Sequence, residues 1–318
     1  MVAHSEMDPM VRNRLKPLKE PFQTEVKKFF YNKETGAVCG RTASSWAKII
    51  IFYIIFYIVL AALFAFCMVV LYYTLDPRIP KYKLDESLIG TNPGLGFRPM
   101  PNDSNALSSL IWYRGTKRKD YEGWVDKLTN FVKEYKTPGL TPGRGQNLVS
   151  CDYGQPVPEG KVCSFDVSRN FYPCVEENNF NYHLQRPCIF LKLNKIYGWR
   201  PEYFSKAEIP AAMPEPVQNF IRGVNGSQLE TIWLSCEGVT AADVENLGSI
   251  QYLPQPGFPG YFFPYMNNEG YLPPIVAIVL NNPKNGILLN IECKAWAKNI
   301  KHDRKEKVGL VQFEVLID

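Results

Sequence analysis

The chain has 318 residues, of which 46% are hydrophobic, and a formal net charge of +5, so it is too apolar to be a disordered polyelectrolyte. Nine Lys or Arg against five Asp or Glu lie in residues 1–48, none in residues 49–75, and twenty-seven against twenty-six in residues 76–318. The excess positive charge therefore lies in an N-terminal tail beside an apolar segment, which suits an anionic membrane surface. A nucleic-acid-binding protein would carry that charge on its folded domain, so this class is excluded.

Residues 49–75 are 27 consecutive uncharged residues and predict one membrane-spanning helix, because roughly 20 apolar residues suffice to cross the hydrocarbon core. A core helix of a soluble protein would rarely lack a polar face over this length. The segment is too long, and begins too far into the chain, to be a cleaved signal peptide. We therefore interpret it as a signal anchor whose excess length favours a tilted helix.

Two prolines, Pro77 and Pro80, end the predicted membrane helix, and an extended stalk is expected after them. From Tyr121 to Tyr135 apolar residues recur at helical spacing, which predicts one amphipathic helix. Short apolar runs separated by Gly, Pro and Asn then predict the strands of a mainly-β, antiparallel sandwich. These runs are Cys188 to Ile196, Thr231 to Cys236, Ile275 to Leu280, Ile287 to Ala297 and Leu310 to Ile317.

Side chains alternate between the two faces of a strand, so two tryptophans, Trp233 and Trp296, are predicted to face outward. Large aromatic side chains are unusual on a solvated face. We expect the helix around Tyr121 to Tyr135 to cover that sheet.

Six of the eight cysteines follow the membrane segment: Cys151, Cys163, Cys174, Cys188, Cys236 and Cys293. Their spacings contain no C-x-x-C and the histidines are scattered, which favours disulfides over a metal site. Asn102 and Asn225 each begin a glycosylation sequon on the same side. Since disulfides form outside the cytosol, residues 76–318 are predicted to be extracellular and residues 1–48 cytoplasmic.

Six cysteines permit fifteen pairings. Strand alternation places Cys236 and Cys293 on inward faces, and a bridge between such positions joins the two sheets of an immunoglobulin-like sandwich, so we pair them. The other four close most simply as Cys151 with Cys163 and Cys174 with Cys188, each across a short loop. A Cys151–Cys174 link would contradict this pairing.

Catalytic signatures are missing from the sequence: it contains no phosphate-binding loop, no G-x-S-x-G elbow, no H-E-x-x-H and no D-x-D. A glycosidase site made of two carboxylates remains possible, since folding can bring such a pair together without any fixed spacing in the sequence. We predict no catalytic residue, metal or cofactor, and hence a chain that is not itself an enzyme.

Tyr53, Phe56 and Tyr57 are spaced by three and four residues in the membrane segment, so they lie on one helix face. Contact with lipid is one interpretation. A tyrosine hydroxyl in the membrane favours a neighbouring helix that can supply a polar partner, so we predict that this stripe contacts another protein.

Several segments resemble the Na+/K+-ATPase β subunit family, and the resemblance runs through nearly the whole chain. They are YNKETGAVCGRTASSWAKI (Tyr31 to Ile49), YYTLDPRIPKY (Tyr72 to Tyr82), PGLGFRP (Pro93 to Pro99), CIFLKLNKIYGWRP (Cys188 to Pro201), GYLPPIVAIVL (Gly270 to Leu280) and CKAWAKNI (Cys293 to Ile300). The resemblance implies a noncatalytic subunit that binds the catalytic α subunit of a P-type ATPase. It would support folding of α and its delivery to the plasma membrane, and modulate K+ affinity.

The same resemblance implies sequential disulfide pairing and an immunoglobulin-like ectodomain. It implies that the stripe faces a membrane helix of α, and that an aromatic segment near residue 263 contacts the extracellular loops of α through Tyr261, Phe262, Phe263 and Tyr265. The residues after it, Met266 to Glu269, depart from the family pattern. A small single-span regulatory subunit remains an open third partner, besides α and the lipid bilayer.

Three other kinds of protein share parts of this pattern with a Na+/K+ pump subunit. A β subunit of H+/K+ pumps is the nearest relative of the proposed family. A type II cell-adhesion glycoprotein would share the membrane anchor, the glycans and the immunoglobulin-like domain. A type II glycosyltransferase is disfavoured by the missing D-x-D and the missing long stem.

Overall fold

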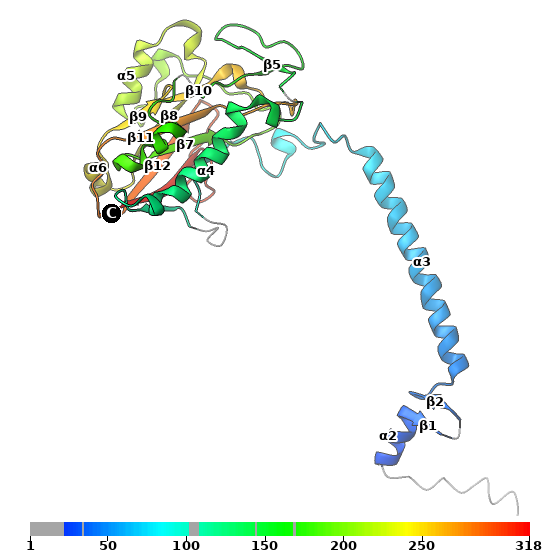
Figure 1. Cartoon of the computed structure of the whole chain (residues 1–318). Helices are drawn as coiled ribbons and strands as arrows, with labels where there is room; N and C mark the ends of the chain where they lie inside the picture. The colour runs from blue at the N-terminus through cyan, green and yellow to red at the C-terminus, as the bar shows by residue number, and fades with distance from the viewer. Residues whose placement is uncertain (1–21, 34, 102–107, 144, 168–169) are drawn as a thin grey trace, which may run out of the picture. The chain divides into compact units, whose positions relative to one another are not determined.

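The computed structural model describes residues 22–33, 35–101, 108–143, 145–167 and 170–318 (Figure 1). The chain divides into two units, Met1–Leu75 and Asp76–Asp318. The division falls where the predicted membrane segment ends.

The N-terminal unit consists of a short helix, a two-stranded hairpin and a long helix: α2 (Phe22–Phe30), β1 (Tyr31–Asn32), β2 (Ala37–Val38) and α3 (Ala43–Thr74). α3 has 32 residues, is long and apolar enough to cross a membrane, and has no buried side chain. It begins before the predicted position 49 because Ala43 to Lys48 contain no proline or glycine that would end a helix. The unit therefore has the one predicted membrane helix, extended at its N-terminal end.

Two sheets form the C-terminal domain. The five-stranded sheet has the order β10-β8-β12-β13-β4, and the four-stranded sheet has the order β3-β7-β11-β9. The strands are β3 (Leu95–Arg98), β4 (Leu110–Tyr113), β5 (Leu148–Val149), β6 (Val162–Cys163), β7 (Cys188–Leu193), β8 (Thr231–Gly238), β9 (Ile250–Leu253), β10 (Gly257–Pro259), β11 (Ile275–Leu280), β12 (Leu289–Trp296) and β13 (Leu310–Ile317). The helices are α4 (Arg118–Lys136), α5 (Glu215–Gly223) and α6 (Ala241–Leu247), with 3-10 turns η1 (Leu84–Glu86), η3 (Pro138–Leu140), η4 (Glu176–Leu184), η5 (Lys206–Glu208), η6 (Gly226–Leu229) and η7 (Gly260–Phe262).

The two sheets pack face to face around one large core. Phe97 of β3 stacks on Phe313 of β13 across the interface, with ring centroids 4.9 Å apart. The prediction of a mainly-β sandwich is thereby confirmed, and β11 and β13 have the predicted bounds. One pairing within these two sheets is not antiparallel: β4 runs parallel to β13, with Leu110 opposite Glu314. The expected purely antiparallel arrangement is therefore wrong at this edge. β5 and β6 form a separate two-stranded parallel pair.

The three disulfides have the predicted pairing: Cys151–Cys163, Cys174–Cys188 and Cys236–Cys293. The expected role of the third is wrong. Cys236 and Cys293 lie directly opposite each other on β8 and β12, which are neighbouring strands of one sheet, so their bridge does not join the two sheets. A hydrogen bond makes such a link instead, because the hydroxyl of Tyr252 on β9 accepts from the backbone N–H of Cys236 at 2.8 Å.

α4 confirms the predicted amphipathic helix, but it covers the other sheet. Phe131 of α4 packs against Phe190 of β7 in the four-stranded sheet, with ring centroids 6.0 Å apart, and Figure 1 shows α4 in front of β7. The outward tryptophans, Trp233 and Trp296, are only 1% and 6% exposed.

α5 covers the two tryptophans. Val217 and Ile221 of this helix are buried with them in a second, separate cluster. The prediction that the Tyr121 to Tyr135 helix covers this sheet is therefore wrong. α5 was not predicted because it has only nine residues, too few for a clear helical period.

Glu292 is a buried carboxylate on the outer face of the five-stranded sheet, 1% exposed. It accepts hydrogen bonds from Arg304 at 2.7 and 3.0 Å and from Gln312 at 2.6 Å, and it pairs with Lys294 at 2.8 Å. Burial alone would raise the pKa of Glu292, but the hydrogen bonds from Arg304, Lys294 and Gln312 outweigh it and lower the pKa to about 2. The carboxylate is therefore charged in the folded protein.

Replacing Glu292 by glutamine is expected to make the free energy of unfolding depend less on pH in the acid range. Because the pKa of Glu292 is about 2 in the folded chain and 4.5 as its ordinary value, the charged form stabilises the fold above pH 4.5, and this stabilisation is lost as the pH falls from 4.5 towards 2. Urea midpoints measured at pH 7 and pH 3 should differ less in Glu292→Gln than in the unchanged chain. The exposed Glu245→Gln is the control, and an equal acid slope in Glu292→Gln and the unchanged chain would contradict the prediction.

Candidate partner-binding surfaces

Four aromatic rings form a patch on one face of α3. Tyr53 stacks on Tyr57 with centroids 6.1 Å apart. Phe52 stacks on Phe56 at 6.2 Å, and edge contacts of 5.5 and 5.4 Å join the two pairs. All four side chains are exposed on the chain as described. The three residues of the predicted stripe thus lie together, and Phe52, four residues before Phe56 and not part of the predicted stripe, completes what we call the α3 patch.

The aromatic segment near residue 263 begins in η7, and its residues differ in exposure. Phe262 is 4% exposed and packs edge-on against Phe165 at 5.6 Å, so its side chain lies inside the domain. The partner contact of Phe262 stays a prediction; in this chain its ring anchors the segment. Tyr261 is half-buried against Tyr153 at 5.1 Å, and burial raises the pKa of Tyr261 to about 12.

Tyr265 belongs to a cluster of aromatic rings around a lysine. The Nζ atom of Lys195 lies 5.2 Å from the ring centroid of Tyr265 and 5.3 Å from that of Tyr271. The two rings are 4.9 Å apart, and burial lowers the pKa of Lys195. A cation held between two rings fixes both of them. Phe263, by contrast, is half-buried edge-on against Trp199 at 5.8 Å.

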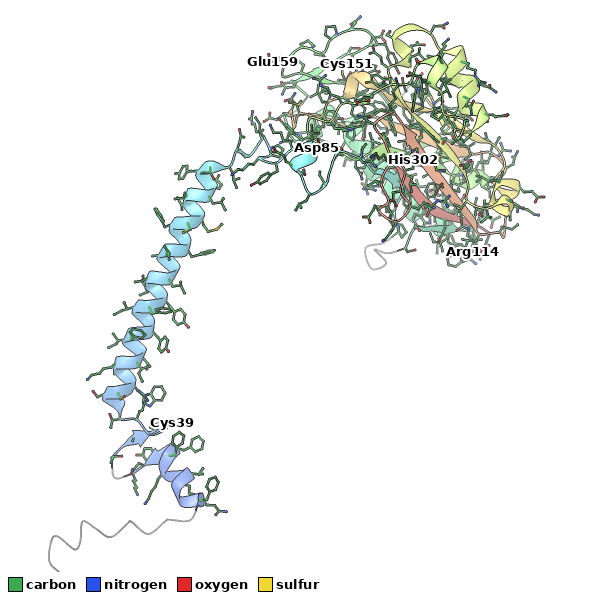
Figure 2. The ribbon with its side chains drawn as sticks, turned by 180° about the vertical axis from the view of Figure 1, so that it is seen from behind. Cys39, Asp85, Arg114, Cys151, Glu159 and His302 are labelled. Carbon is green, nitrogen blue, oxygen red and sulfur yellow. A yellow bond between two sulfur atoms is a disulfide. The ribbon has the colours of Figure 1, made fainter. Side chains whose placement is uncertain are left out.

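A groove of about 1260 Å³ lies beside this segment. One wall is the loop closed by the Cys151–Cys163 bridge, and Figure 2 shows Cys151 and Glu159 at one end of the domain, with Arg114 at the other. At the rim, Arg78 pairs with Glu269 at 3.5 Å. The lining combines aromatic and charged side chains, among them Tyr153, Tyr197, Tyr203, Tyr261, Arg200 and Glu230. We call this feature the aromatic groove. The sequence did not predict that its lining includes Tyr153, Tyr197 and Tyr271, because these residues come from separate loops.

Of the two predicted glycosylation positions, Asn225 lies in the described ranges. Asn102 lies outside the described residues. Asn225 is exposed, directly before η6, and its Oδ1 atom accepts a hydrogen bond from Lys206 at 2.6 Å.

Side chains that could bind a metal ion are scattered through the described ranges. These ranges hold no cluster of three or more His, Cys, Asp or Glu side chains that could bind a metal ion. Aromatic side chains such as those that line the groove are enriched in surfaces that bind other proteins.

Comparison with known proteins identifies the family. A family model described as the sodium/potassium ATPase beta chain matches residues 16–313. The chain belongs to this family. The β-2 subunit of the sodium/potassium-transporting ATPase of Drosophila melanogaster is 55% identical over 307 residues, covering 95% of each chain. The β-1 subunit of the same organism is 40% identical over 290 residues, covering 91% of each chain.

A more distant relative is the probable β-3 subunit from Caenorhabditis briggsae, which is 33% identical over 293 residues, covering 92% of this chain and 86% of the relative. The resemblance inferred from sequence segments is therefore confirmed over nearly the whole length. The chain is a β chain of the sodium/potassium-transporting ATPase family, with one candidate membrane span and three disulfides.

Proposed function

We propose that the chain is a noncatalytic subunit that pairs with the catalytic α subunit of a P-type Na+/K+-transporting ATPase. In this proposal α3 crosses the plasma membrane once, with the N-terminus in the cytosol and the C-terminal domain outside. The chain supports folding and delivery of α and modulates its K+ affinity. The observation that carries the proposal is the α3 patch on a membrane helix of a sodium/potassium ATPase β chain.

The α3 patch favours a protein neighbour over lipid. Apolar side chains gain little by exchanging lipid tails for another apolar helix, so helices associate in membranes through close packing and through polar groups that find partners. The hydroxyls of Tyr53 and Tyr57 are such groups, and stacking of their rings turns both towards the same side. A membrane helix of α can supply the packing surface and the hydrogen-bond partners.

The aromatic groove is the proposed contact outside the membrane. Tyr261, Phe263 and Tyr265 each present a partly exposed edge beside the groove, and their buried edges are held by Tyr153, Trp199 and Lys195. Rigid aromatic side chains lose little conformational entropy on binding, which suits them to anchor a partner. An extracellular loop of α is the proposed occupant.

Co-purification tests the pairing itself. Mild detergent extraction of the full chain from its own membranes is expected to yield a stoichiometric P-type α chain. Recovery of the chain without any such partner, but with clustering of cells that display it, would favour the adhesion glycoprotein and contradict the proposal. Identifying the α chain by mass spectrometry also separates a Na+/K+ pump from an H+/K+ pump.

Replacing Tyr53 and Tyr57 by leucine is expected to change K+ activation of the pump more than its assembly. The double variant removes two hydroxyls and two rings from the α3 patch, whereas the groove contacts outside the membrane remain and hold the subunits together. The measurement is ATPase activity as a function of K+ concentration, together with the α-to-β ratio after purification.

Ile51→Leu with Ile58→Leu is the matched control for this double variant. Both positions are exposed and lie about half a helical turn away from the patch. K+ activation should be unchanged in the control. An unchanged activation curve in the tyrosine variant as well would rule out a working contact at the α3 patch.

A further inference from the structure

α2 carries an uncovered apolar face. Phe22, Val26, Phe29 and Phe30 are spaced by four, three and one residues, which places them within about 100° of one another around the helix. Phe22, Phe30 and Phe29 are 79%, 61% and 55% exposed. A helix of nine residues in water normally exposes far less apolar surface than these three phenylalanine side chains do.

Backbone hydrogen bonds hold α2 close to the start of α3. The N–H groups of Cys39 and Gly40 donate to the last two carbonyls of α2, those of Phe30 at 3.2 Å and Phe29 at 3.0 Å. Both donors lie in a tight turn with positive φ, 52° at Cys39 and 72° at Gly40. From the first turn of α3, the indole N–H of Trp46 donates to the carbonyl of Val38 at 2.9 Å, so the hairpin is tied to α3 as well.

The charge around α2 suits an anionic membrane surface. Residues 22–48 contain five Lys or Arg against two Glu, and the five are Lys27, Lys28, Lys33, Arg41 and Lys48. Trp46 lies where the polar segment meets the apolar one, a position at which tryptophan typically lies at the level of lipid headgroups. An apolar face, basic flanks and a tie to a membrane helix together are the properties of a helix that lies in the membrane interface.

We propose that α2 binds the cytosolic surface of the bilayer, with Phe22, Val26 and Phe30 inserted among anionic lipid headgroups. This proposal rests on the proposed function only for its sidedness, because the cytosolic leaflet is the one rich in anionic lipid. The occupant is lipid rather than protein, since the helix is tied to a span that already lies in the bilayer. Lys27 lies at the side of the apolar face and can extend its ammonium group to the phosphates.

Spin-label accessibility in the full chain tests this docking. Single cysteines replace Phe22, Val26 or Phe30 on the apolar face, and Thr24, which is two positions from both Phe22 and Val26 in the sequence. The two free cysteines are first removed as Cys39→Asn, because asparagine tolerates positive φ, and Cys67→Ala. The labelled chains are reconstituted in vesicles of phosphatidylcholine alone and of equal parts phosphatidylcholine and phosphatidylserine, and exposure to oxygen is compared with exposure to a water-soluble nickel complex.

In the phosphatidylserine vesicles, labels at positions 22, 26 and 30 are expected to show an oxygen-to-nickel ratio several-fold above that at position 24, with a depth of about 5–10 Å. Lys27→Glu with Lys33→Glu should abolish that difference, while a label at Ile58→Cys reports lipid in every sample and verifies insertion of α3.

High nickel exposure at all α2 positions would overturn the proposal. A second result would also overturn it: labels at positions 22, 26 and 30 become shielded from both reagents, but only when α is present in the same vesicles. In that case a protein, and not lipid, would cover the apolar face. The lipid contact itself is measured on the chain without α, so a failure to pair with α would leave that measurement unaffected.

Discussion

Replacing both Cys236 and Cys293 by alanine is expected to lower the free energy of unfolding by about 4 kcal/mol. The bridge spans 57 residues of sequence, so removing it returns a large loop-closure entropy to the unfolded chain. The two cysteines already face each other on neighbouring strands held by backbone hydrogen bonds. The native sheet therefore does not need the bridge for its geometry, and we expect the loss to act mainly through the unfolded state.

The measurement is urea unfolding of the full chain in detergent, followed by the near-ultraviolet signal of the buried tryptophans. Cys151→Ala with Cys163→Ala is the matched control: its bridge spans only 12 residues and should contribute about 3 kcal/mol. That variant should also loosen the wall of the aromatic groove. If the control destabilised the fold more than the Cys236 and Cys293 variant, the loop-length explanation would be wrong.

Replacing Trp233 by alanine is expected to cost about 3–5 kcal/mol. Trp233 is 1% exposed and is one of the two tryptophans in the cluster that fastens α5 to the five-stranded sheet. Trp296 lies directly opposite it on β12, and Phe220 of α5 packs edge-on against it at 6.0 Å. An alanine would leave a cavity under α5, and that helix should become sensitive to proteolysis before the rest of the domain.

Two variants separate the cavity from other effects of Trp233. Trp112→Ala removes an exposed indole whose N–H donates to Asp318, and it should cost no more than about 1 kcal/mol. Trp233→Phe keeps most of the ring volume and removes an indole N–H that has no hydrogen-bond partner in the described ranges, so its cost should be small. Equal losses from Trp233→Ala and Trp112→Ala would contradict the role assigned to the cluster.

Local patterns were sufficient for much of this fold. β11 and β13 are apolar runs bounded by Pro, Gly and Asn, and their ends were predicted correctly. The α3 patch was also mostly predictable, because residues three and four apart on a helix must share a face. In each case the deciding residues lie within a few positions of one another.

Features that depend on distant residues were missed. The inward direction of Cys236 follows from alternation, but nothing in the sequence reveals that β8 pairs directly with β12. Likewise, Phe262 points inward because Phe165, far away in sequence, fills the space beside it. The covering helix was misassigned for the same reason: α4 shows its period over 19 residues, whereas tertiary packing brings the nine-residue α5 over Trp233.

The parallel pairing of β4 with β13 affects how the domain can be made in the cell. β4 precedes its partner β13 in the chain by about 200 residues, and every other strand of the five-stranded sheet lies between them in the sequence. Until translation delivers β13, β4 has no partner and β12 lacks its neighbour on one side, so two strand edges stay open during synthesis. The sheet can be completed only after all five strands have been made, and such long-range pairing is slow and exposes open edges to aggregation.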